Sequence, residues 1–139
     1  MLRVDYEGRG SQTRLRATMI IIASKYLIRG GAFVLIACAV LHSLAWTRVQ
    51  ADFAPAGRAM AALVWFLLSI DWLIIAGLWL LGASQGTGAR WSLLLSSVIP
   101  ITVAVGLCLT VGPRFFPIYL QLSAAALVIV GALYMGRST

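Results

Sequence analysis

The stretch Trp65–Trp79 reads WFLLSIDWLIIAGLW, and every residue in it except Ser69 and Asp71 is apolar or glycine. It belongs to a longer apolar run in a chain of 139 residues that is 61% hydrophobic and only 11% charged. A soluble domain carries about a quarter charged residues, so this composition is typical of a membrane protein. The stretch therefore predicts a helix that spans a lipid bilayer and carries a carboxylate inside the membrane.

Four apolar runs reach the length of about 20 residues that a spanning helix needs. They are Tyr26–Trp46, Ala59–Leu81, Trp91–Val111 and Pro117–Met135. Only helices or closed barrels satisfy their backbone hydrogen bonds within a bilayer, and continuous apolar runs indicate helices. We expect an all-α polytopic membrane protein, with four transmembrane helices in an antiparallel bundle over residues 25–139.

Residues 1–24 form a basic segment ahead of the first span. We expect a cytoplasmic tail that starts with a mobile stretch over residues 1–10. Residues 11–24 have two interpretations: an interfacial amphipathic helix that turns into the membrane at Ser24 and Lys25, or an extension of the first span into the cytoplasm.

The distribution of Lys and Arg predicts the orientation. With the N-terminus inside, eight basic residues fall on the cytoplasmic side and three on the other side. The eight are Arg3, Arg9, Arg14, Arg16, Lys25, Arg29, Arg90 and Arg137, and the three are Arg48, Arg58 and Arg114. We expect both termini in the cytoplasm and the bacterial inner membrane as the location.

Ionisable groups at bilayer depth cost free energy and usually face the interior of a helix bundle. If Trp46 and Ala59 mark one boundary, His42 lies roughly 6 Å, Asp71 roughly 18 Å and Arg29 roughly 25 Å below it. His42 and Asp71 are then about 12 Å apart in depth. We therefore expect Asp71 to face the interior, either as an ion pair with Arg29 or in the protonated form. The alternative is a contact between Asp71 and a partner subunit.

Two polar layers follow from the same count. Thr102, beside the helix-bending Pro100, is predicted to join Asp71 in a middle layer. An outer layer is predicted to hold His42, Ser43, Thr110, Gln121 and Ser123. We expect the hydroxyls of Ser96, Ser97 and Thr102 to bond back to their own helix.

Trp65, Trp72 and Trp79 recur every seven residues and share one side of a helix. Because Asp71 is expected inside, this stripe is expected on the flank, about 100° round the helix. It would face lipid, form a seam with a partner or self-associating copy, or offer a surface to a ring-shaped ligand such as a quinone or pigment.

The sequence holds no strong catalytic signature, and we assign no catalytic residue, no metal site and no cofactor. Cys38 and Cys108 lie in apolar runs and are expected to be small buried hydrophobes. The net charge of +7 is concentrated beside an apolar run, which indicates binding to anionic lipid and not to nucleic acid.

The favoured function is a non-catalytic accessory or scaffold subunit of a larger membrane complex. The alternatives are a small oligomeric proton-coupled transporter or channel that uses Asp71, and a membrane enzyme acting on lipid or quinone.

Overall fold

The computed structural model describes the backbone of residues 5–136 and the side chains of residues 12–136. Between residues 5 and 136 the chain is helical and contains no strand. The elements are α1 (Asp5–Val49), η1 (Gln50–Asp52), α2 (Pro55–Gln85), η2 (Gly86–Ala89), α3 (Arg90–Thr110) and α4 (Phe116–Met135). Arg3 and Arg137 lie outside the described residues, as does the side chain of Arg9.

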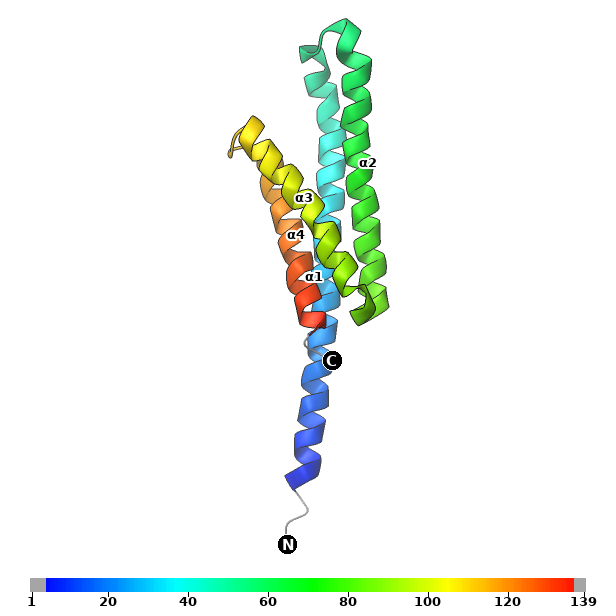
Figure 1. Cartoon of the computed structure of the whole chain (residues 1–139), viewed down its shortest axis with the longest axis vertical. Helices are drawn as coiled ribbons and strands as arrows, with labels where there is room; N and C mark the ends of the chain where they lie inside the picture. Colours follow the sequence, from blue (N-terminus) through cyan, green and yellow to red (C-terminus); the bar gives the residue numbers. More distant parts are fainter. Residues whose placement is uncertain (1–4, 137–139) are drawn as a thin grey trace.

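Three helical stretches are long and apolar enough to cross a membrane: Gln12–Asp52, Pro55–Thr110 and Phe116–Met135. The second of these contains both α2 and α3, which the short η2 turn joins. Figure 1 shows that α2 and α3 run in opposite directions on either side of this turn. Gly86, whose φ of 74° is strained for residues with a side chain, makes the reversal.

α1 is one continuous helix through Ser24 and Lys25, with no turn at that point. Its first part projects beyond the other helices (Figure 1). The turn at Ser24 and Lys25 that the interfacial-helix interpretation requires is therefore not formed. Residues 5–10, which were expected in a mobile tail, belong to the same helix. The Ser24 hydroxyl donates to the Ile21 carbonyl at 2.7 Å, so it is satisfied without breaking the helix.

α1 packs against both α2 and α4, and α3 packs mainly against α4. Glycines allow the close approach of α1 and α4. A Cβ on Gly31 would lie 2.7 Å from the Ala124 carbonyl oxygen, and a Cβ on Gly131 would lie 2.9 Å from the Ser24 carbonyl oxygen. Small residues at such positions bring backbones together and maximise van der Waals contact. These two glycines therefore allow the close packing of α1 and α4.

The contact between α2 and α3 is confined to the part near η2, and beyond it the two helices diverge (Figure 1). α3 continues through Pro100, which is buried. The hydroxyls of Ser96, Ser97 and Thr102 bond to carbonyls of their own helix at 2.7–2.9 Å, as expected.

Candidate functional site

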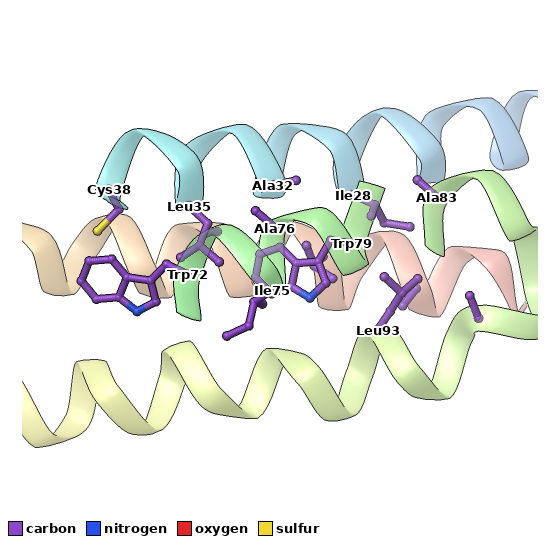
Figure 2. Packing of buried hydrophobic residues seen from close by; sticks show 14 of the residues in the cluster. Ile28, Ala32, Leu35, Cys38, Trp72, Ile75, Ala76, Trp79, Ala83 and Leu93 are labelled. Carbon is purple, nitrogen blue, oxygen red and sulfur yellow. The ribbon is translucent and has the colours of Figure 1, made fainter. Parts of the chain in front are cut away.

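The tryptophan stripe of α2 points into the protein. Trp72 is 1% exposed and Trp79 is fully buried. Figure 2 shows both rings between α1 and α3, close to Leu35 and Ala76. The indole Nε1 of Trp79 donates to Ser96 Oγ at 2.8 Å. The expectation that these rings face lipid or a partner is wrong. This side of α2 packs in the core, and the indole N–H of Trp79 has its acceptor there.

Asp71 consequently lies on the outside. Asp71 directly precedes Trp72, so its side chain points about 100° away from that of Trp72 round the helix. The Asp71 side chain is exposed. Its neighbours on this side are exposed and apolar, and together they form what we call the Asp71 face: Leu67, Ile70, Asp71, Ile74 and Leu78. The expected interior position of Asp71 is wrong for the isolated chain.

The partners expected for Asp71 are not beside it. Arg29 is exposed and makes no ion pair or hydrogen bond with Asp71 or any other described side chain. Thr102 is exposed and its hydroxyl is bonded to the Val98 carbonyl, while Pro100 is buried in α3. The predicted middle layer of Asp71, Thr102 and Pro100 is therefore not formed inside the chain.

His42 lies in an aromatic cluster near the α1–α2 turn. Its ring stacks on Trp65, with centroids 4.0 Å apart and planes 7° from parallel, and meets the edge of Trp72 at 5.0 Å. Trp46 joins the cluster at 5.7 Å from Trp65. Trp65 Nε1 also donates to the backbone carbonyl of His42 at 2.7 Å.

These contacts correct the predicted register of the first two helices. Trp46 is level with Trp65 and Phe66, not with Ala59, so His42 lies opposite the Trp65–Trp72 segment. The predicted depths hold only if the two helices face each other from the ends of the loop. The η1 turn instead carries the chain past the end of α1 before α2 begins (Figure 1).

Three side chains near this cluster have buried polar atoms without a hydrogen-bond partner. They are His42 at Nε2, Trp72 at Nε1 and Gln121 at both amide atoms. Gln121 is fully buried on α4 and lies beside the Cys38 thiol of α1. Of the predicted outer layer, His42 and Gln121 point into the protein, whereas Thr110 and Ser123 are exposed. Buried polar atoms are normally satisfied, so these three side chains stand apart from the rest of the core.

Two apolar hollows flank the His42–Trp65 stack. A groove of about 560 Å³ is lined by residues of α2, by Leu107 of α3 and by His42. A smaller cavity of about 150 Å³ lies between His42 and the start of α4, against Phe115, Phe116 and Pro117.

The described side chains do not build an evident reaction centre. Within residues 12–136 no group of three or more His, Cys, Asp or Glu could hold a metal ion. Cys38 is buried beside Gln121 and Cys108 is half-buried, and both thiols are free. What the arrangement offers is an apolar groove with unpaired polar atoms close by, and a separate exposed carboxylate.

The sequence places His42 and Gln121 in one polar layer and Trp65 and Trp72 on one side of a helix, but it does not bring these two pairs together. The seven-residue spacing of the tryptophans was the usable signal, since it placed Trp65 and Trp72 on one side of α2. Comparison with protein-family models, curated protein sequences and solved structures found no match to this chain.

Proposed function

We propose that the protein crosses the membrane four times, through α1, α2, α3 and α4, as an antiparallel bundle. Three helical stretches with membrane-spanning length and hydropathy support this, as does the reversal at η2 within the longest of them. α2 has 31 residues, and at about 1.5 Å per residue it exceeds a hydrocarbon core of about 30 Å.

The proposed orientation has both termini in the cytoplasm, in a bacterial inner membrane. The basic residues Arg14, Arg16, Lys25 and Arg29 of α1 lie toward the end where α4 finishes, and Arg90 lies against Gly136 there. Arg48, Arg58 and Arg114 belong to the opposite end. An excess of Lys and Arg on the cytoplasmic side is the rule for membrane proteins.

The proposed function is that of a non-catalytic accessory subunit that contacts a larger membrane complex through the Asp71 face. One observation carries this: Asp71 is exposed among apolar side chains, 16 residues from the start of α2 and 14 from its end. A charged group at the centre of a spanning helix costs about 2.5–3.5 kcal/mol on insertion scales. A partner that supplies a hydrogen bond or an opposite charge reduces that cost.

The occupant of the Asp71 face is proposed to be a membrane helix of another subunit, with a basic or hydrogen-bond-donating side chain at the depth of Asp71. A two-fold contact between copies of this chain would place two carboxylates face to face, because such interfaces bring the same patch together. Like charges at close range disfavour each other. A different chain with a donor fits the carboxylate better.

Co-purification tests this proposal. Tagged wild-type chain, extracted in mild detergent, is expected to retain a stoichiometric membrane partner. Asp71→Leu is expected to reduce that partner by about tenfold, which corresponds to about 1.4 kcal/mol, with Asp71→Asn in between. Asp52→Asn, which alters an exposed acid in η1, is the matched control.

Equal recovery of the partner by wild type and Asp71→Leu would contradict the proposal, as would recovery of this chain alone. Proton flux that is lost in Asp71→Asn while the partner is kept would favour the transporter instead. In that case the pathway would run between subunits, because Trp72 and not Asp71 occupies the interior. Thermal unfolding of each purified variant checks that the substitution leaves the fold intact.

A further inference from the structure

Two cationic side chains of α1 lie close together on its surface without a counter-charge. Arg29 is exposed and Lys25 is half-buried. They are four residues apart, so they lie about 40° from each other round the helix. Neither side chain forms an ion pair or a hydrogen bond with the described part of the chain. Like charges at this spacing disfavour each other, so an anion placed between them is stabilising.

The surface around Arg29 is apolar and exposed. Tyr26, three residues before it, is 68% exposed, and Phe33, four residues after it, is 63% exposed. Residues at these spacings share one face of a helix. In a helix that spans a membrane, such a face is covered by lipid chains. A phospholipid can therefore bring a phosphate to the two cations while its acyl chains cover the two rings.

The packing of α1 on α4 sets the depth of the two cations. Gly131 of α4 lies against Ser24, and α4 ends at Met135, four residues or about 6 Å farther on (Figure 1). Lys25 is therefore about one turn inside the end of α4, and Arg29 is one turn deeper. Side chains on an α-helix lean toward its N-terminus, and long basic side chains extend to the headgroup layer. Both charges are thus directed toward the level of the lipid phosphates.

The acids of the chain are far from this pair. Between Glu7 and Asp52 the sequence contains no Asp or Glu. Glu7 is 18 residues before Lys25 on the same helix, which is about 27 Å, and Asp52 follows the opposite end of α1. Asp71 lies near the middle of α2. The anion that neutralises this pair must therefore come from outside the chain.

We propose that Lys25 and Arg29 bind the headgroup of an anionic phospholipid, whose phosphate oxygens accept from both side chains and whose acyl chains lie along Tyr26 and Phe33. A guanidinium group forms strong charge-assisted hydrogen bonds with phosphate. Basic residues next to a spanning helix attract anionic lipids. The site rests on the proposed membrane crossing and does not depend on a partner at the Asp71 face.

Native mass spectrometry of the purified full chain, released from detergent micelles, measures this binding. The chain is titrated with dioleoyl phosphatidylglycerol, with dioleoyl phosphatidylcholine, and with glycerol 3-phosphate, which carries a phosphate but no acyl chain. Phosphatidylglycerol is expected to bind its first site about tenfold more tightly than phosphatidylcholine, whose choline group cancels the phosphate charge. Glycerol 3-phosphate is expected to bind more weakly than phosphatidylglycerol by about tenfold or more, because it cannot cover the two rings.

Two substitutions locate the bound headgroup. Lys25→Gln and Arg29→Gln should each weaken the first phosphatidylglycerol site about fivefold, and the double variant should weaken it about twentyfold. Phosphatidylcholine binding should change little in the same variants. Arg29→Gln alters an exposed side chain, so it keeps the test decisive if Lys25→Gln does not fold.

Three control variants separate a discrete site from general attraction. Arg16→Gln removes the same charge from an exposed position of α1, about 180° from Lys25 round the helix. Arg58→Gln removes a charge at the opposite end of the bundle, where the guanidinium donates to the Phe53 carbonyl. Asp71→Leu alters the proposed partner contact. All three should bind phosphatidylglycerol like the wild type.

Four results would overturn the proposal. The first is equal affinity of the wild type for phosphatidylglycerol and phosphatidylcholine. The second is wild-type phosphatidylglycerol affinity in the double variant. The third is an equal loss in Arg16→Gln, which would indicate diffuse attraction. The fourth is binding of glycerol 3-phosphate as tight as that of the lipid, which would indicate a soluble phosphate compound as the ligand.

Discussion

The imidazole of His42 lies flat against the indole of Trp65, and the same indole donates its N–H to the His42 backbone carbonyl. The ring centroids are 4.0 Å apart and the hydrogen bond is 2.7 Å long. One residue of α2 thus holds both the side chain and the backbone of a residue of α1. This double contact fixes the register of α1 and α2 and sets the position of His42 between two hollows.

Trp65→Phe should therefore destabilise the fold, because it keeps most of the stacking surface but removes the N–H donor. The expected loss is about 1 kcal/mol in the free energy of unfolding, which is typical of one hydrogen bond. Reversible unfolding by SDS in mixed micelles measures it. Trp91→Phe, at a ring that is 68% exposed, is the matched control, and an equal effect of the two substitutions would contradict the assigned role of Trp65.

Gly31→Ala should weaken the contact between α1 and α4. Its Cβ would lie 2.6 Å from Val128 Cγ2 and 2.7 Å from the Ala124 carbonyl oxygen, a backbone atom that moves only with its helix. Overpacking of this kind costs about 1–3 kcal/mol. Neighbouring Gly30 offers the control, since its Cβ would meet only Leu127 Cδ1, at 3.9 Å.

Gly30→Ala should be neutral or stabilising by up to about 1 kcal/mol, because alanine has the higher helix propensity. The same SDS unfolding experiment compares the two variants. Equal stability of Gly31→Ala and Gly30→Ala would show that the backbones of α1 and α4 are farther apart than the contact of Gly31 with Ala124 requires.

The hydrogen bond between Trp79 and Ser96 joins α2 to α3 and can be measured by a double-mutant cycle. Trp79→Phe, Ser96→Ala and the double variant should give a coupling free energy of about 0.5–1.5 kcal/mol. Strict additivity of the two single effects would mean that the indole N–H and the hydroxyl do not interact.

The helical class and the apolar stretches could be predicted from the sequence, because hydropathy over about 20 residues measures the free energy of transfer into a bilayer. The small residues Gly31 and Gly131 could be recognised as packing positions for a similarly local reason. Where a spanning helix has no polar side chain, its specific packing depends mainly on small residues that let two helix backbones approach closely.

The rotation of α2 could not be predicted in this way. All sides of a spanning helix are apolar, so hydropathy does not distinguish the side that faces lipid from the side that faces protein, and only the charge of Asp71 indicates a direction. In the single chain the buried side is set instead by indole N–H groups that find acceptors, at His42 for Trp65 and at Ser96 for Trp79. The approach of His42 to Trp72 was missed because the length of η1 shifts the helix register.

Site-specific photo-crosslinking in native membranes tests the proposed contact at the Asp71 face most directly. Benzoylphenylalanine at Ile74, which is 56% exposed on that face, should give a discrete protein adduct that disappears with Asp71→Leu. The probe at Leu73, exposed at the same depth but about 160° from Asp71 round the helix, should give no such adduct. An adduct of equal yield from both positions, or none from Ile74, would contradict the account.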